Sequence, residues 1–441
     1  MMNNGNVHGA GTRATVDRLY ALVANDEDAR TCTDISEEAC REVPGNFFKI
    51  IVANLLSKVG DLLINPKTIL AWLIGAVGAP GFLTAALVPI RESGSLIPQL
   101  LIGAWMRRHP VRKGFWVLGS VIQGVCVLGM ALAVWQWQGL AAGLAIVSLL
   151  VVFSLGRGFC SVAMKDVQGK CIPKARRGRL TGLAATLSGL VTLGVGVVLF
   201  RGGQDPGMVF YSVLLVGAAL AWLLAAGVFA SVDEFAGETA GGGHALRDAW
   251  RSLGLLISDA PFRNFVIARA LLMASALGSP FLVVLAQKQN SGAALLGAFL
   301  VASSLASTVS ASVWGFMADT SSRKVMIRGG GLASATCLLV AVLALAGEGA
   351  AAWFYPFAFF VLAIAHAGVR IGRKTYLVDM AGGVKRTDYT AVSNTVIGVL
   401  LLVAGGISAA VSLLGTEWAL ISLGAMGVLG TLWSWKLPEV E

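Results

Sequence analysis

Apolar runs long enough to cross a lipid bilayer recur along this chain and decide what it can fold into. A spanning helix needs roughly 20 mostly apolar residues, and the sequence contains twelve such runs. The first six are 47–73, 82–106, 115–136, 141–164, 180–200 and 208–230. The second six are 262–286, 292–317, 325–346, 353–372, 389–412 and 416–435. The alternating pattern of membrane β-strands is absent, so the sequence predicts an all-α polytopic membrane protein with twelve transmembrane helices.

Charged residues are few and lie between the apolar runs. They make up 13% of the 441 residues, whereas a soluble domain carries about 25%. The net charge of +10 comes from Lys and Arg in short segments, which favours an anionic membrane surface over nucleic acid. Membrane lipid is therefore an expected partner and nucleic acid is not, and the protein is expected to be a monomer.

The basic residues are unevenly shared between the two sides of the predicted bundle. The segments after the second, fourth, eighth and tenth runs carry Arg107, Arg108, Arg112, Lys113, Lys165, Lys170, Lys174, Arg176, Arg177, Arg179, Arg323, Lys324, Arg328, Arg373, Lys374, Lys385 and Arg386. The opposite segments hold only Arg201 and Lys288, beside Asp205, Glu348 and Glu417. Because cytoplasmic loops are enriched in Lys and Arg, both termini are expected to be cytoplasmic in a bacterial inner membrane.

The polar segments divide the chain into four parts. Residues 1–45 lack the apolar stretch of a signal peptide and are expected to form a cytosolic tail. Two six-helix bundles are expected at 46–230 and 262–441, joined by a cytoplasmic linker at 231–261. Within the linker, apolar residues recur at helical spacing: Leu246, Trp250, Leu253 and Ile257. They predict a short amphipathic helix on the inner surface or, alternatively, an extension of the span that follows.

The two sets of six runs resemble each other in sequence. Arg157, Asp166 and Gly169 in the first set correspond to Arg370, Asp379 and Gly382 in the second. Gly103 corresponds to Gly315, and Ala53 and Pro66 correspond to Ala268 and Pro280 within one residue. Their common order indicates an internal duplication, and duplicated halves place a binding cavity at their interface near the bilayer midplane.

A motif in the second set carries a family resemblance. Residues 315–324 read GFMADTSSRK, which resembles the G-x-x-x-D-x-x-x-R-K loop motif of the major facilitator superfamily. Arg157 followed by Gly158 is similar to the fourth-helix Arg motif of its proton-coupled members. The resemblance covers about residues 46–436 and departs from the family pattern at Arg107, where an Asp is usual. The fifth span also lacks the Gly-Pro motif of drug/proton antiporters.

This resemblance implies two pseudo-symmetric six-helix bundles and a secondary transporter that moves a small solute by alternating access, with proton coupling. Two alternatives are a drug-efflux antiporter and a transporter-like membrane sensor or scaffold that moves nothing.

Charges within the first two spans are the leading candidates for a solute and proton pathway. Such a charge costs roughly 2.5–3.5 kcal/mol on insertion scales, so it normally faces a cavity or a partner. Lys58 and Asp61 share a face of the first span, and Arg91 and Glu92 lie at similar depth in the second. We hypothesise that Asp61, Arg91 and Glu92 line the central cavity and that one carboxylate carries the coupling proton. The alternative is a structural ion-pair cluster that joins the two spans.

Two residues of the second half extend the predicted pathway. Arg269 lies inside the seventh span and could bind an anionic group of the solute, or its side chain could reach back to the inner surface. His366 precedes Arg370 by one helical turn and could carry a proton or serve only in packing.

The predicted gate lies at the cytoplasmic ends of the helices. The loop residues Gly315, Asp319, Arg323 and Lys324 belong to the family-like motif. A carboxylate there can pair with Arg across the bundle when the gate is closed. We expect Arg157, Asp166, Arg370 and Asp379 to supply the partners, or the basic residues to serve orientation only.

Catalytic chemistry is not expected. The four histidines lie in separate regions, and no H-E-x-x-H, G-x-S-x-G or phosphate-loop motif occurs. None of the six cysteines forms a CxxC pair, so we expect neither a disulfide framework nor a zinc site. The sequence therefore predicts a protein that is not an enzyme and that has no cofactor and no bound metal.

Overall fold

The fold of the chain is helical throughout its described part. The computed structural model describes residues 15–20, 37–201, 207–237, 239, 253–289, 292–318, 320–346, 351, 353–380 and 385–440. Every regular element in these ranges is a helix. Nine helical segments among them are long and apolar enough to cross a membrane. The predicted all-α polytopic membrane fold is confirmed.

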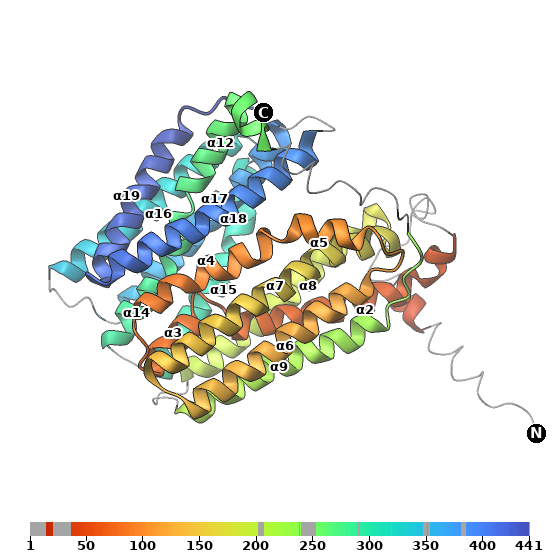
Figure 1. The fold of residues 1–441 in the computed structure, drawn as a ribbon, viewed down its shortest axis with the longest axis horizontal. Helices are drawn as coiled ribbons and strands as arrows, with labels where there is room; N and C mark the ends of the chain where they lie inside the picture. Colours follow the sequence, from red (N-terminus) through yellow and green to blue (C-terminus); the bar gives the residue numbers. More distant parts are fainter. Residues whose placement is uncertain are drawn as a thin grey trace, which may run out of the picture.

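The helices follow the predicted runs, with some runs broken into shorter pieces (Figure 1). The N-terminal half contains α2 (Glu37–Leu63), α3 (Ile69–Ala76), α4 (Phe82–Leu96), α5 (Gln99–Met106), α6 (Lys113–Gln136), α7 (Gly139–Cys171), α8 (Lys174–Arg201) and α9 (Met208–Ala230). The C-terminal half contains α11 (Leu255–Ser258), α12 (Ala260–Leu271), α13 (Ala274–Leu277), α14 (Ser279–Gln289), α15 (Ala293–Ala318), α16 (Ser322–Leu345), α17 (Phe354–Met380), α18 (Lys385–Ser412) and α19 (Thr416–Ser434).

Prolines accompany the breaks in the first, second and seventh predicted spans. Pro66 lies between α2 and α3, Pro98 between α4 and α5, and Pro280 just inside α14. Proline lacks the backbone N–H and clashes with the preceding turn, so it interrupts a helix. Between α2 and α3, the Asn65 side chain accepts a hydrogen bond from the backbone N–H of Lys67 at 2.9 Å. Such irregular backbone is tolerated inside a membrane where it faces protein or a cavity.

Small residues bring neighbouring helices of one half into close contact. A Cβ added at Gly119 of α6 would lie 2.5 Å from the carbonyl oxygen of Gly156 in α7. A Cβ at Gly60 of α2 would lie 2.9 Å from the Trp222 ring in α9. Close backbone approach through small residues is the usual basis of helix packing in lipid, where no hydrophobic force drives helices together.

The two halves meet along a few helix pairs. Within the N-terminal half, α6 packs against α7 and α9, and α4 packs against α7; within the C-terminal half, α16 packs against α17 and α19. Between the halves, α4 packs on α18, α8 on α15, and α3 on α14. The halves meet around α3 and α14 and diverge toward the side where α2 begins and α19 ends, the termini side (Figure 1). The opposite side is the far side.

Several helices extend beyond their apolar runs. On the termini side, α7 continues to Cys171 and α17 to Met380, so Lys165, Arg373 and Lys374 lie on helices and not in loops. At the other end of the chain, α2 begins at Glu37, inside the predicted tail, and Cys40 is disulfide-bonded, contrary to expectation.

The predicted linker is only partly covered by the described residues. Leu246 and Trp250 lie outside them, whereas Leu253 is partly buried and Ile257 is 84% exposed. The short helix α11 ends at Ser258, and Asp259 caps α12 by accepting a hydrogen bond from the backbone N–H of Phe262 at 3.0 Å. The seventh span therefore starts anew at α12 and is not a continuous extension of the linker.

Candidate functional site

A cavity of about 470 Å³ lies between the two halves. The N-terminal half contributes the break after α2, α4, α5 and α7, and the C-terminal half contributes residues of α12 to α15, α17 and α18. Its charged lining is strongly basic and comprises Lys67, Lys165, Arg269, Arg370, Arg373, Lys374 and one carboxylate, Glu92. Both halves must therefore come together to form this site.

The cavity is closed off toward the far side by direct contacts between the halves. Gln287 of α14 donates to the Trp72 carbonyl of α3 at 2.9 Å. Beside Glu92, at the depth of the cavity, the Ser93 hydroxyl of α4 donates to the Gly398 carbonyl of α18 at 2.7 Å and joins the two halves. A Cβ at Gly405 of α18 would lie 2.2 Å from the Pro89 ring in α4. Toward the termini side, where the halves diverge (Figure 1), the cavity is lined by the helix extensions described above.

Asp61 is held by two arginines within the N-terminal half. One carboxylate oxygen lies 2.6 Å from Arg91 of α4, and the other lies 2.5 Å from Arg157 of α7. The Arg91 guanidinium also lies 4.9 Å from the centre of the Phe153 ring. Asp61, Arg91 and Arg157 are 19%, 12% and 30% exposed, and none of them is among the residues that line the cavity. We call these three residues the Asp61 cluster.

Glu92 and Lys58 do not belong to the Asp61 cluster, and only Glu92 lines the cavity. Glu92 follows Arg91 in α4 and points about 100° away from it, so that it lines the cavity and is exposed there. Its carboxylate forms no ion pair with any described residue, although the charges of Lys67 and Arg373 act on it. Lys58 is half-buried one turn before Asp61 and does not line the cavity. Of the four predicted residues in the first two spans, the structure places Glu92 alone in the cavity wall.

Arg269 lines the cavity from the C-terminal half. Its guanidinium donates to the hydroxyl of Ser393 and, at 2.9 Å, to the side-chain oxygen of Asn394, both in α18. The residue is 7% exposed, and its buried Nε has no partner among the described residues. Arg269 therefore does not reach the membrane surface, which was the alternative from the sequence.

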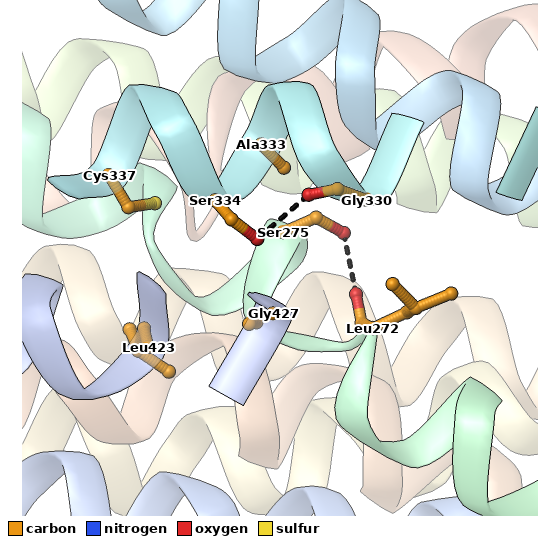
Figure 2. A pocket seen from close by; sticks show the side chains of 9 residues that line it. Leu272, Ser275, Gly330, Ala333, Ser334, Cys337, Leu423 and Gly427 are labelled. Carbon is orange, nitrogen blue, oxygen red and sulfur yellow. Dashed lines mark hydrogen bonds between the residues drawn. The ribbon is translucent and has the colours of Figure 1, made fainter. Parts of the chain in front are cut away.

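His366 of α17 also lines the cavity and contacts a serine of the broken span. Its Nδ1 lies 3.1 Å from the Ser275 hydroxyl, which also lies 2.8 Å from the Leu272 carbonyl. The hydroxyl and the ring nitrogen are within hydrogen-bonding distance, and the imidazole tautomer decides which of them donates. Figure 2 shows a crevice beside Ser275, between α13, α16 and α19; it is too narrow for a water molecule, so it is packing space and not a second site.

The predicted gating residues do not form a single cluster. Arg157 belongs to the Asp61 cluster, Arg370 lines the cavity, and Asp379 is exposed at the end of α17. Asp166 pairs with Arg112 of its own half. None of the ion pairs between described residues joins the two halves.

The family-like motif contacts the C-terminal segment of its own half. Arg323 pairs with Glu439 at 2.7 Å, whose other oxygen accepts from Ser321 at 2.9 Å. Gly315 lies in α15 with open space around its Cα, and Lys324 is exposed in α16. Asp319 lies outside the described residues.

The same arrangement recurs in the N-terminal half. Glu234, after the last helix of that half, accepts hydrogen bonds from the backbone N–H groups of Arg112 and Lys113 at the start of α6, and pairs with Lys170 at 2.7 Å. A carboxylate at a helix N-terminus satisfies free N–H groups and the positive end of the helix dipole. Each half thus ends in a glutamate at the N-terminus of its third spanning helix.

Four cavity residues were missed as site residues in the sequence: Lys67, Lys165, Arg373 and Lys374. Three of them were counted among loop charges because the apolar runs ended before them. A helical signal was nevertheless present, since His366, Arg370 and Arg373 follow one another at spacings of four and three and so share one helix face.

Comparison with known proteins identifies the fold. No protein-family model matches the chain, and no curated protein is detectably similar in sequence. A D-xylose–proton symporter matches with a TM-score of 0.66 at 14% identity, covering 89% of this chain and 98% of that one. The nucleoside transporter NupG matches with a TM-score of 0.65 at 11% identity, covering 89% and 98%. The xylose transporter XylE from E. coli, in an inward open conformation, matches with a TM-score of 0.64 at 12% identity, covering 90% and 97%.

At these identities the likeness concerns the fold alone, and it extends over nearly the whole chain. The fold that the motif resemblance implied is therefore confirmed: this chain has the fold of the major facilitator superfamily transporters.

Proposed function

We propose that this protein is a secondary transporter that moves a small solute by alternating access, with proton coupling, across a bacterial inner membrane. The carrying observation is the charged cavity between two duplicated halves, closed on the far side and extending toward the termini side. Its volume of about 470 Å³ falls within the range of small-molecule sites, about 300–1,000 Å³. We assign the termini side to the cytoplasm because its segments are basic, and under this assignment the conformation faces inward.

Alternating access requires the halves to separate on the far side and close on the termini side. The far-side contact is tight at α8 and α15, where a Cβ at Gly297 would lie 2.3 Å from the backbone nitrogen of Phe200. On the termini side, closure would bring the helix ends of the two halves together, and opening would break the contacts formed there. The absence of ion pairs across the halves among the described residues supports an open termini side.

Proton coupling is assigned to Glu92. It is the single carboxylate in the cavity wall and has no ion-pair partner among the described residues. When ionised, it partly neutralises Lys67 and Arg373; when protonated, it leaves both cations free for a solute. Asp61, with each oxygen held by an arginine, is assigned to joining α2, α4 and α7 within the N-terminal half.

The basic lining also separates this proposal from drug efflux. A cavity lined, among the described residues, by six basic side chains and one carboxylate repels a cationic drug. A sensor or scaffold would keep the cavity but would not exchange solute across the membrane.

Transport is tested by counterflow in proteoliposomes, with metabolites first selected by the thermal shift they cause in the purified protein. Exchange of a labelled solute for the same unlabelled solute, abolished in protein-free liposomes, is the expected result. If every solute that binds fails to exchange, the transporter assignment is wrong and the sensor alternative stands.

Alternating access is tested by two glycine variants, one at the contact between α8 and α15 and one on α8 away from that contact. Gly297→Ala places its Cβ against the Phe200 backbone, whereas Gly194→Ala, in α8, meets nothing within 4 Å. We expect Gly297→Ala to shift double electron–electron resonance distances toward far-side opening and Gly194→Ala to leave them unchanged. Identical distance distributions in both variants would contradict the proposed movement.

A further inference from the structure

We infer that the cavity takes a small organic dianion, held between Lys67 of the N-terminal half and Arg269, Arg370 and Arg373 of the C-terminal half. This inference rests on the transport function proposed above and names the class of its solute.

The first observation is uncompensated charge in the inner part of the cavity. Lys67, Arg370 and Arg373 form no hydrogen bond through their side chains and no ion pair with any described residue. Among the described residues that line the cavity, Glu92 is the one carboxylate, and it faces the four cations Lys67, Arg269, Arg370 and Arg373. Unpaired cations within a membrane are costly, and an anion that enters from water removes this cost.

The second observation is a buried hydrogen-bond donor that has no acceptor among the described residues. The Nε of Arg269 is buried without a partner, while the rest of the guanidinium is held by Ser393 and Asn394. These two contacts fix the orientation of the group before a ligand arrives, which lowers the entropy lost on binding. A pre-oriented guanidinium recognises the planar or tetrahedral oxygens of carboxylate and phosphate.

The third observation concerns the number of charges and the shape of the ligand. Lys67 lies in the break after α2, whereas the three arginines lie on α12 and α17, so the cations come from both halves. A single negative charge cannot neutralise both walls, and a dianion can bridge them. Phe359 and Met273 supply an apolar surface in the same cavity for the carbon skeleton between the two acidic groups. Bridging would also favour the approach of the two halves around the bound solute.

The experiment uses the purified full-length protein in nanodiscs and measures binding by calorimetry and thermal shift. The dicarboxylate arm compares succinate with butyrate and putrescine, which share a four-carbon skeleton and differ in charge. The phosphate arm compares glycerol 3-phosphate with glycerol. We expect at least one of the two dianions to bind about tenfold or more tightly than its controls, because a charge-assisted hydrogen bond contributes roughly 1.5–3 kcal/mol.

A matched pair of arginine variants locates the binding. Arg373→Gln removes a cavity cation, whereas Arg328→Gln removes an exposed arginine of α16 outside the cavity. We expect Arg373→Gln to weaken dianion binding about 10- to 100-fold and Arg328→Gln to leave it within twofold. Equal losses in both variants would show a surface effect and overturn the site.

The remaining outcomes separate this inference from the transport proposal. Absence of binding by both dianions up to about 10 mM, tenfold above the usual upper range for metabolites, overturns the dianion class. The dianion class is overturned as well if butyrate or putrescine binds as tightly as succinate, or glycerol as tightly as glycerol 3-phosphate. Counterflow of that solute would leave the transport proposal intact. Dianion binding without counterflow keeps the ligand class and overturns transport.

Discussion

Two groups of charged residues lie inside this membrane protein, and they differ in whether their charges are paired. In the Asp61 cluster, one carboxylate is held by two guanidiniums at 2.5 and 2.6 Å, and all three residues come from one half. In the cavity, Lys67, Arg370 and Arg373 form no ion pair with described residues and come from both halves. Both groups carry excess positive charge, so charge alone does not distinguish them.

The difference indicates which charges are structural. A buried ion pair formed within one rigid bundle does not need to break when the two bundles move, so the Asp61 cluster can persist through a transport cycle. The cavity cations gain a partner only from a solute or from the opposite half. We therefore interpret the cavity cations, which lack ion-pair partners among the described residues, as functional, and the paired charges of the Asp61 cluster as structural.

The largest expected effect comes from breaking the Asp61 cluster. Asp61→Asn leaves Arg91 and Arg157 beside each other without a counter-ion. Removing one partner of a buried ion pair costs about 3–5 kcal/mol, and the partial exposure of Arg157, 30%, places the expected loss of unfolding free energy at about 3 kcal/mol. Unfolding in mixed detergent–SDS micelles measures it.

An exposed ion pair provides the control for this prediction. Asp233 pairs with Lys49 at 2.7 Å on the termini side and is 51% exposed. Asp233→Asn should cost less than about 1 kcal/mol. If Asp61→Asn is no more destabilising than Asp233→Asn, the Asp61 cluster is not the structural element described here.

The second prediction concerns the cavity carboxylate. Glu92→Gln should retain counterflow, since exchange needs no net proton movement, but should reduce accumulation driven by a pH gradient more than about tenfold, equivalent to about 1.4 kcal/mol. Its unfolding free energy should change little, because the exposed carboxylate has no ion-pair partner among described residues. Gradient-driven uptake at the wild-type level in Glu92→Gln would move the coupling proton to another group.

The positions of the helices could be predicted from the sequence because hydropathy reports directly on lipid contact. The breaks within the spans could not be predicted in this way, because hydropathy contains no information about backbone hydrogen bonds. Pro66 and Pro280 were recognised only as matching positions of the repeat, yet they lie at the interruptions of the first and seventh spans. The extensions of α7 and α17 were missed because a helix facing water remains helical after its apolar run ends.

The site was only partly predictable for a related reason. The similar depth of Asp61 and Arg91 suggested their pairing, and the structure contains it. The second arginine, Arg157, was expected at a gate, because the sequence does not show which face of α7 is turned toward α2. Arg373 was interpreted as an orientation signal, although its helical spacing from His366 and Arg370 already placed the three on one face.

The third prediction compares an arginine of the cavity with an arginine of the Asp61 cluster, and we expect their removal to change the unfolding free energy in opposite directions. Arg373→Gln removes one of several like charges and should raise the unfolding free energy of the ligand-free protein by about 1 kcal/mol, as expected where function costs stability. Arg91→Gln removes a partner of Asp61 and should lower it. Both are measured under the same unfolding conditions as Asp61→Asn. A loss of stability in both variants would show that the cavity cations are satisfied in a way the contacts do not reveal.

The smallest expected effect is a difference in salt dependence. Raising NaCl from 0.1 to 1 M shortens the Debye length from about 10 to about 3 Å, which screens repulsion between charges that share water. Repulsion between Lys67, Arg370 and Arg373 in the open cavity should therefore weaken, stabilising the wild type by a few tenths of a kcal/mol relative to Arg373→Gln. General effects of salt on the micelle and the protein surface cancel in this difference. If the unfolding free energies of the two proteins change equally with salt, the cavity cations are too far apart, or too well hydrated, to repel one another. Repulsion in the empty cavity would then give no reason for the solute to be a dianion.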